Sequence, residues 1–384
     1  MKKQLSAIAL LAGTAIGSGM LSLPLVLARY GLVFSCILMI AFIWVAYYSS
    51  IIRAELNINS RADYSLKDVG EHYSGIIASR IGSVSLKLLS YSLIAAYLHG
   101  LASLVKVFVN IETVYVICGI SVIVMILLYF SNSLISRINK ILFMFLISAF
   151  IVVTFGLLVK SDLAVLNIPE TQGVTIKSIA IALPIVFTSF GFQGSIHSLT
   201  KFVNNDVKLI KRACLWGSVI PAIVYVCWLC CTILIIYNTD VNLFNKIVTG
   251  NVELSEMVDG LTGITHIPYL KAMFWTISLF SILTSIIGVG LAIFDEWNMK
   301  FDKIKSSMMT MIPSTILAIF VPNAFIRILD MAGMILLILA IFLPVYLYRR
   351  MQLVKHLDIS RNFGLIAITI IGIILFVSGI IGVI

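Results

Sequence analysis

The chain has 384 residues, of which 60% are hydrophobic and 11% are charged, and its formal net charge at pH 7 is +10. A soluble domain has too little interior to bury so much apolar surface, so the composition predicts a membrane protein. The apolar runs are continuous rather than alternating with period two, which excludes a transmembrane β-barrel. The basic residues are scattered through short connections, a pattern that does not predict nucleic-acid binding. We therefore expect an all-α membrane protein.

Eleven apolar stretches are candidates for transmembrane helices, since about 20 residues are needed to cross the hydrocarbon core. Their expected bounds are 5–28, 32–52, 83–106, 113–130, 140–159, 175–199, 213–237, 269–294, 307–321, 325–347 and 363–384. The ninth is the shortest. Two longer polar connections separate these stretches: residues 53–82, where we expect an interfacial helix, and residues 238–268.

The distribution of basic residues predicts the orientation. If the N-terminus is cytoplasmic, most of the 27 lysines and arginines fall in cytoplasmic connections, where such residues accumulate. An odd number of spans then places the C-terminus in the periplasm. The first apolar run continues to Leu27, too long for the core of a cleaved signal peptide, so we expect an uncleaved first helix.

Two of the stretches contain glycine interruptions. The first reads "GTAIGSGML" (13–21), where each glycine costs about 1 kcal/mol relative to alanine in a helix. The sixth contains Gly191 and Gly194 beside hydroxyl residues. Because the two stretches are five apart, they would occupy matching positions in two inverted halves, which is typical of a transporter's binding site. Non-helical backbone is tolerated in a bilayer only where it lines a cavity. The alternative is close helix packing through small residues, but the matched pair favours broken helices.

The polarity of such breaks indicates the ligand. A helix half that ends at a break presents free carbonyl groups and a partial negative charge, whereas the half that begins there presents free N–H groups and a partial positive charge. Together they can bind an ammonium and a carboxylate group. We therefore expect a zwitterionic amino acid as the small-molecule substrate.

Three motifs carry a resemblance to a known family. "GTAIGSGMLSLPL" (13–25), "FTSFGFQGSIHS" (187–198) and "TSIIGVGLAIFD" (284–295) resemble signatures of the hydroxy/aromatic amino acid permease family, more specifically of its tyrosine- and tryptophan-type branch. The resemblance implies a fold of the leucine-transporter (LeuT) type, with five-helix inverted repeats in residues 1–160 and 175–347 and an extra helix at 363–384. It also implies import of aromatic L-amino acids across the bacterial inner membrane, by proton symport with alternating access.

The same resemblance implies a set of site residues. The backbone at both breaks would bind the amino-acid end of the substrate: Gly13, Thr14, Ile16, Gly17, Gly19, Thr188, Ser189, Phe190 and Gly191. Thr284 and Ser285 match the place where related sodium-driven transporters bind their coupling ion. The chain departs from the family at Gln193, where histidine is usual, and at His197, where proline is usual. Proton-driven relatives also often have a lysine inside the fifth stretch, whereas here its interior, "ILFMFLISAFIVVTF", has no ionisable group.

The third stretch places Tyr97 and His99 within the membrane, where polar and ionisable groups are functional hypotheses by default. Either residue could contact an aromatic substrate or relay a proton; alternatively, a neighbouring helix satisfies its polar end. We expect Lys87 to extend to the inner interface. For Asp295 and Glu296, at the inner end of the eighth stretch, both a gate contact and a solvated helix end remain open.

We expect neither a cofactor nor a metal site, and no obligate protein partner beyond membrane lipid. Cys227 and Cys230 form a C-x-x-C pair without a second pair or a nearby histidine. The five histidines are scattered, which does not predict an enzyme. The alternatives left open are a serine or threonine transporter, a channel, and a non-transporting amino-acid sensor on the same fold. Whether protons or sodium ions drive transport also stays open.

Overall fold

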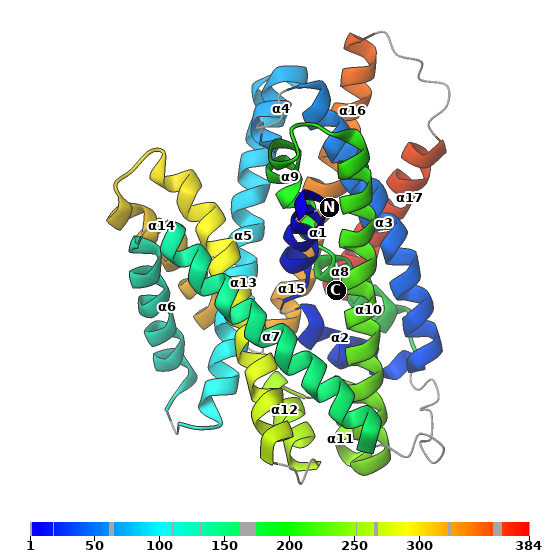
Figure 1. The fold of residues 1–384 in the computed structure, drawn as a ribbon, viewed down its shortest axis with the longest axis vertical. Helices are drawn as coiled ribbons and strands as arrows, with labels where there is room; N and C mark the ends of the chain where they lie inside the picture. The colour runs from blue at the N-terminus through cyan, green and yellow to red at the C-terminus, as the bar shows by residue number, and fades with distance from the viewer. Residues whose placement is uncertain are drawn as a thin grey trace.

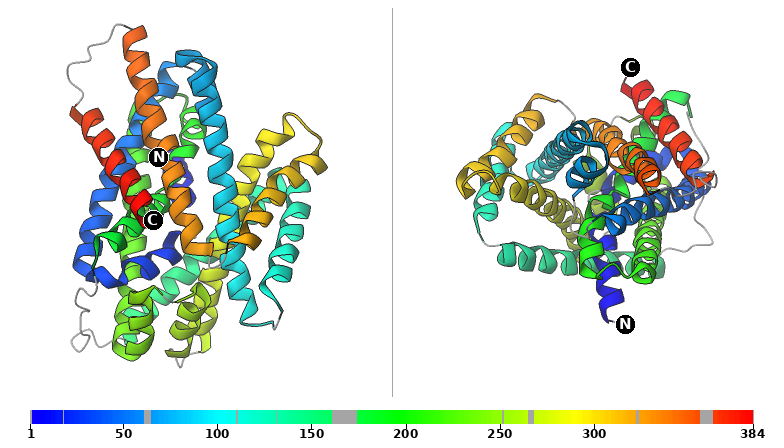
Figure 2. Two further views of the ribbon diagram at one scale, coloured as in Figure 1. Left: turned by 180° about the vertical axis from the view of Figure 1, so that it is seen from behind. Right: turned by 90° about the horizontal axis from the view of Figure 1, so that it is seen from above.

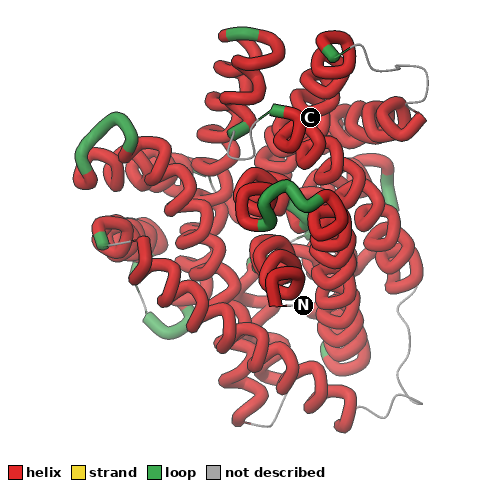
Figure 3. Tube along the Cα trace, turned by 45° about the horizontal axis from the view of Figure 1, so that its top comes forward, coloured by secondary structure: helices red, strands yellow, loops and turns green. Residues whose placement is uncertain are grey.

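The protein is described from a computed structural model that covers residues 2–17, 19–60, 65–109, 111–130, 132–160, 174–250, 252–264, 268–321, 324–355 and 363–383. The regular elements in these ranges are all helical, as Figure 3 shows. In chain order they are α1 (Lys2–Ala15), α2 (Gly19–Leu27), η1 (Ala28–Tyr30), α3 (Gly31–Asn59), α4 (Leu66–Ser74), α5 (Ile76–Lys106), α6 (Thr113–Tyr129), α7 (Asn132–Lys160), α8 (Ile176–Ser189), η2 (Phe192–Ser195), α9 (Ile196–Phe202), α10 (Val207–Thr239), α11 (Val241–Thr249), α12 (Leu254–Ile264), α13 (Pro268–Asn298), α14 (Lys303–Phe320), α15 (Ala324–Leu337), η3 (Ile338–Phe342), α16 (Leu343–Val354) and α17 (Phe363–Val383).

Each expected apolar stretch is helical, but helix length alone does not establish eleven spans. Within the described ranges, eight helical segments are long and apolar enough to cross a membrane. The first stretch is split between α1 and α2, and α2 continues through η1 and α3 as one segment, Gly19–Asn59. α6 has 17 residues, and α14 has 18 residues and begins at Lys303, with Lys305 in its first turn.

The two polar connections also contain helices. α4 lies in the first, as expected, and begins with a capping box, in which the Asp68 N–H donates to Ser65 Oγ and the Ser65 N–H donates to Asp68 Oδ2. α11 and α12 lie in the second connection. These short helices satisfy backbone groups that would otherwise be unpaired beside the membrane helices.

The helices run between two ends of different charge (Figure 1). α4, α9 and the end of α16 lie at one end, which we call the basic end because it carries Lys67, Lys201, Arg349, Arg350 and Lys355. α11 and α12 lie at the opposite end, which we call the acidic end because it carries Asp240, Glu253, Glu256 and Asp259.

The long helices form two groups that meet along α5. In the first group, α1 packs against α10, α10 against α3, and α8 against α2, α15 and α17. In the second, α13 packs against α7, α5 and α14, and α14 packs against α6. α5 also packs against α15 and so joins the groups, which Figure 2 shows from behind and from above. The first group contains both glycine interruptions.

Candidate functional site

Both expected helix breaks are present. α1 ends at Ala15 and α2 begins at Gly19, whereas α8 ends at Ser189 and regular α-helix resumes only at Ile196. Between α8 and η2, the ψ angles of Phe190 and Gly191 are 22° and 39°, far from the helical value of about −42°. Pro184, inside α8, removes one further backbone donor shortly before the second break.

The two broken helices approach each other from opposite ends of the molecule. α1 begins on the side of the basic end and stops in the interior, and α9, which continues α8 beyond its break, lies at the basic end (Figure 1). The C-termini of α1 and α8 therefore converge in the interior. A helix C-terminus carries unpaired carbonyl groups and a partial negative charge, so the site joins two such ends.

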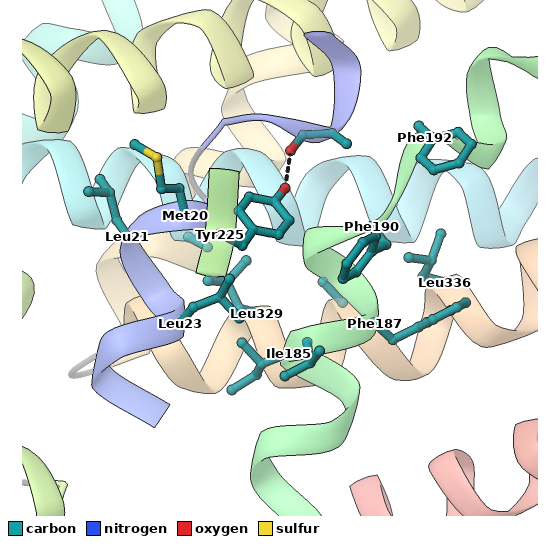
Figure 4. Close-up of a cluster of buried hydrophobic side chains, with 14 of the residues drawn as sticks. Met20, Leu21, Leu23, Ile185, Phe187, Phe190, Phe192, Tyr225, Leu329 and Leu336 are labelled. Atoms are coloured by element: carbon teal, nitrogen blue, oxygen red, sulfur yellow. Dashed lines mark hydrogen bonds between the residues drawn. The ribbon is translucent and has the colours of Figure 1, made fainter. Parts of the chain in front are cut away.

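Tyr225 of α10 connects these two C-termini. Its hydroxyl lies 2.6 Å from the carbonyl oxygen of Ala15 and 2.6 Å from that of Ser189. The side chain is fully buried, and Figure 4 shows it beside Phe190, with one of the two hydrogen bonds drawn. The hydroxyl has one proton to share between two acceptors. Its donor thus partly satisfies the two carbonyl groups at which a ligand's ammonium group could bind.

The glycines at the breaks allow close contacts. A Cβ atom on Gly17 would collide with Ser285 Oγ of α13, and one on Gly19 would lie 2.8 Å from Ser189 Cβ of α8. A Cβ atom on Gly191 would lie 2.8 Å from the Thr188 carbonyl oxygen, which is backbone and cannot turn away. The structure therefore brings together four of the predicted residues, Gly17, Gly19, Ser189 and Ser285.

The hydroxyl groups near the breaks donate within their own helices. Thr188 Oγ1 donates to the Pro184 carbonyl at 2.8 Å, Ser189 Oγ to that of Ile185 at 3.1 Å, and Ser285 Oγ to that of Ser281 at 2.8 Å. Thr284 Oγ1 has the same arrangement, 2.9 Å from the Phe280 carbonyl. Such back-bonding uses the proton of each hydroxyl and leaves lone pairs to accept a bond from a ligand or to coordinate a cation.

Aromatic side chains surround the second break. The Phe190 ring stacks on Phe42 of α3, with centroids 6.3 Å apart and planes at 14°, and meets the Tyr225 ring edge-on at 5.5 Å. Phe187 and Phe190 are both fully buried (Figure 4). Two apolar hollows of about 430 and 440 Å³ lie elsewhere, between α3, α8 and α17 and between α7 and α13, and neither is lined by a residue of the breaks. The first hollow is lined by Phe42, so it lies next to the Phe42–Phe190 stack.

Three other predicted residues lie at the first break or in the last turn of α1 before it. Ile16 is buried at the first break, whereas Gly13 faces the Phe143 ring of α7. Thr14 is exposed, and its hydroxyl accepts a bond from Ser195 Oγ of η2 at 3.4 Å, which links the two breaks on a second side.

Tyr97 and His99, both on α5, have different surroundings. Tyr97 is buried and interacts electrostatically with Tyr225, so it borders the site. His99 instead interacts with Glu253, which precedes α12 at the acidic end, and its Nδ1 is buried without a hydrogen-bond partner in the described chain. The geometry therefore favours Tyr97 over His99 as a pocket residue.

The residues that depart from the family pattern lie on the basic-end side of the second break. Gln193 is buried, and its Nε2 donates to Ser49 Oγ of α3 at 3.2 Å. The His197 ring lies 2.9 Å from the Gly194 carbonyl oxygen through Nδ1. Both side chains thus stabilise the segment that follows the break.

Two buried polar residues near the breaks were missed in the sequence. Tyr225 lies within a continuous apolar run, and nothing in its spacing indicates that its hydroxyl reaches two helix ends. Asp330 of α15 is a carboxyl group inside a predicted span, which the rule for ionisable residues in membranes would have selected. Asp330 is 4% exposed, and its neighbour Leu329 offers its carbonyl oxygen to Thr188 Oγ1 at 3.5 Å.

The chain is similar to known transport proteins along nearly its whole length. It is 28% identical to "Tyrosine-specific transport system 1" of Haemophilus influenzae, over 98% of this chain and 96% of that protein. It is 25% identical to a "Tryptophan-specific transport protein" of Pseudomonas aeruginosa (88% and 84%) and 25% identical to "Glutamine transporter 2" of Aliivibrio fischeri (92% and 90%). The profile of the tryptophan/tyrosine permease family matches residues 1–384. This multi-pass membrane protein therefore belongs to the tryptophan/tyrosine permease family.

Proposed function

We propose that the protein imports aromatic L-amino acids by alternating access, and that the paired breaks bind the amino-acid end of the substrate. The observation that carries this proposal is the convergence of the α1 and α8 C-termini on the Tyr225 hydroxyl. In the bound state, the substrate ammonium takes the place of that hydroxyl at the Ala15 and Ser189 carbonyl groups. The exchange replaces a neutral donor with a charged one, which forms stronger hydrogen bonds.

The aromatic lining supports an aromatic side chain in the substrate. The Phe42 ring contacts the rings of both Phe187 and Phe190, and a substrate ring can replace part of these contacts with contacts of the same kind. The relatives named for tyrosine and tryptophan fit this preference, whereas the relative named for glutamine makes a polar amino acid the first competitor to test. Serine and threonine remain the alternative from the hydroxy amino acid branch.

The two antiparallel broken helices support the inverted-repeat organisation. We propose that residues 1–160 and 175–347 form two repeats of five helices in a LeuT-like fold, with α17 as the extra helix. The eight long segments become eleven spans when α6 and α14 are added and when α1 and α2 together count as a first span separate from α3. The basic end then faces the cytoplasm, which places the N-terminus inside and the C-terminus in the periplasm. Reporter fusions after Lys305 and Arg361 should give cytoplasmic signals and a fusion at the C-terminus a periplasmic signal; the reverse pattern would exclude this topology.

Proton symport is part of the proposal, with no bound cofactor. Sodium coupling is the alternative. The Ser285 hydroxyl lies beside Gly17 at the first break, and Thr284 precedes it on α13, so their hydroxyl lone pairs could coordinate a sodium ion. Sodium-free vesicles with an imposed pH gradient separate the two ions: accumulation under these conditions supports proton coupling, and a strict requirement for sodium contradicts it.

Counterflow in proteoliposomes tests transport itself. Vesicles loaded with unlabelled tyrosine should take up labelled tyrosine, and external tryptophan and phenylalanine should compete, while serine and glutamine should not. Competition by serine or glutamine but not by tryptophan would overturn the aromatic preference. Saturable binding without exchange would identify a sensor instead of a carrier.

A further inference from the structure

Asp330 is a buried carboxyl group with an unusual lack of partners. Among the described residues, the buried charged side chains are Asp330 and Arg53, and Arg53 lies in the last two turns of α3, near the basic end. Asp330 is the seventh residue of α15, about 9 Å along the axis from the first. Its side chain is 4% exposed, and its Oδ1 has no hydrogen-bond partner in the described chain.

Two other carboxyl groups near the ends of long helices have partners. Glu55 accepts a 2.6 Å bond from the Tyr348 hydroxyl, and Glu296 lies 3.3 Å from Lys87 Nζ. Each has a structural partner that accounts for its place. Asp330 has no such partner, and an isolated carboxylate in apolar surroundings costs several kcal/mol.

The charged and titratable groups on the elements around α15 do not neutralise Asp330. α8 carries Lys177 in its exposed first turn, and α5 carries Tyr97 and His99 beside Gly100, which faces Phe325 of α15. α17 and η3 have no titratable residue in their described ranges, and Arg327 on α15 itself is exposed. α15, which packs against α5, α8 and α17, thus buries a carboxyl group for which the described chain shows no ion-pair partner.

The helix that carries Asp330 packs directly on the second break. Leu329 offers its carbonyl oxygen to Thr188 Oγ1, Gly333 lies against the Pro184 carbonyl, and Leu336 lies near Gly191. In the buried cluster of Figure 4, Leu329 and Leu336 of α15 lie close to Ile185 and Phe187 of α8, against which α15 packs. A change in the separation of α15 and α8 at Asp330 must consequently move the backbone to which we assign substrate binding.

We propose that Asp330 carries the coupling proton. This inference rests on the proposed proton symport and names the group that performs it. A proton from the periplasm binds a carboxylate oxygen of Asp330 and forms an O–H bond; the neutral acid can be buried in the packed position that Asp330 occupies on α15. In the conformation that is open to the cytoplasm, the same O–H bond breaks, and water accepts the proton. Because the carboxylate needs water, α15 can close against the break only after protonation, which couples proton binding to substrate enclosure.

The test compares wild-type protein, Asp330→Asn and Asp259→Asn in sodium-free proteoliposomes. Asp259 is an exposed residue of α12, and its substitution removes a carboxylate without touching the breaks. Three quantities are measured: tyrosine counterflow without a gradient, accumulation under an inward pH gradient, and acidification of the lumen, reported by a trapped dye, when substrate is added. Asp330→Asn mimics the protonated acid, so we expect it to retain counterflow, to lose substrate-driven acidification and to accumulate tyrosine only to the external concentration. Asp259→Asn should match the wild type in all three.

The possible failures are distinguishable. If Asp330→Asn accumulates tyrosine and acidifies the lumen as the wild type does, Asp330 is not the carrier, while proton symport stands. If the wild type itself accumulates nothing with a pH gradient, the proposed coupling fails and the inference fails with it. If Asp330→Asn also loses counterflow, Asp330→Glu decides: recovery of acidification by this titratable variant supports the proposal, and counterflow without acidification overturns it.

Discussion

The broken-helix region and the block built on α5, α13 and α14 place polar groups in apolar surroundings in different ways. At the breaks, the polar groups are backbone carbonyls at helix ends, and one hydroxyl, that of Tyr225, serves two of them. In the block, the helices are continuous and polar side chains pair with one another. Lys87 of α5 lies 3.3 Å from Glu296 and 4.1 Å from the centroid of the Trp297 ring, both on α13.

The paired side chains of the block connect α5, α13 and α14. Ser83 Oγ donates to Glu296, Trp297 Nε1 donates to the Tyr91 hydroxyl, and that hydroxyl donates to the Met309 carbonyl of α14. Lys87 is therefore an ion-pair partner, and Glu296, at 17% side-chain exposure, is not a solvated helix end. We infer that paired side chains joining three helices make a rigid support, even though Glu296 Oε2 has no hydrogen-bond partner in the described chain, whereas two helix ends that share one donor make a binding point.

The largest expected effect is that of a side chain at the breaks. Gly191→Leu and Gly17→Leu should abolish substrate binding and uptake while the protein still reaches the membrane. Gly191→Ala should be more harmful than Gly17→Ala, because its Cβ would meet the Thr188 carbonyl, whereas that of Gly17 would meet the movable Ser285 hydroxyl.

Gly119→Leu in α6 is the matched control for these substitutions, since a Cβ there has no neighbour within 4 Å. Gly372 is less suitable, because its Cβ would lie 2.9 Å from Ile341. Equilibrium binding and uptake are measured on the purified variants. Folded Gly191→Leu protein with normal affinity would show that the break serves packing only.

The next effect concerns the hydroxyl that joins the helix ends. Tyr225→Phe leaves two buried carbonyl groups without their donor, which should cost about 1–3 kcal/mol of stability and lower the Tm of the substrate-free protein. Because the substrate ammonium supplies new donors, saturating tyrosine should raise the Tm of this variant more than that of the wild type.

Tyr73→Phe is the control for the lost hydroxyl. The Tyr73 hydroxyl also donates to a carbonyl, that of Asn59 at 3.0 Å, but it lies at the basic end. Its removal should lower the Tm equally with and without substrate. If substrate raises the Tm of Tyr225→Phe, Tyr73→Phe and the wild type equally, the carbonyl groups to which Tyr225 donates are not part of the binding site.

A smaller effect is expected in the supporting block. In a double-mutant cycle of Lys87→Met and Glu296→Gln, the coupling energy should be about 1 kcal/mol, because the pair is mostly enclosed but still reaches solvent. Thermal unfolding measures it, and substrate affinity should stay unchanged in all three variants. A loss of affinity that matches the loss of stability would mean that the block takes part in binding.

The smallest effect is expected at His99. His99→Asn should change the KM for tyrosine by less than about two-fold, the range of a substitution away from the functional groups, since its interaction is with Glu253 at the acidic end. Tyr97→Phe is the comparison, because Tyr97 borders Tyr225, and its effect should be the larger one. Concentration-dependent uptake decides between them, and a larger effect at His99 would place the pocket nearer the acidic end.

The helical class and the two breaks could be predicted from the sequence because the bilayer constrains them strongly. Apolar runs of sufficient length must be helical, and glycines such as Gly17 and Gly191 interrupt them at readable positions. The exact helix ends could not be predicted, because α3, α5 and α10 continue into polar residues beyond the apolar runs, where neighbouring helices stabilise them.

The partners at the site depend on contacts between distant segments. Nothing in the run around Tyr225 indicates that its hydroxyl meets Ala15 and Ser189, 210 and 36 residues away. The pairing of Gln193 with Ser49 and of Lys87 with Glu296 is equally non-local. Asp330 differs, because a lone carboxyl residue in an apolar stretch can be recognised in the sequence. Only the structure shows that its Oδ1 has no hydrogen-bond partner in the described chain.

A structure determined with saturating L-tyrosine or L-tryptophan tests the central claim most directly. We predict the substrate ammonium within about 3 Å of the Ala15 and Ser189 carbonyl oxygens, with the Tyr225 hydroxyl displaced from at least one of them and the ring against Phe190. A substrate bound elsewhere, with both Tyr225 hydrogen bonds unchanged, would contradict the claim.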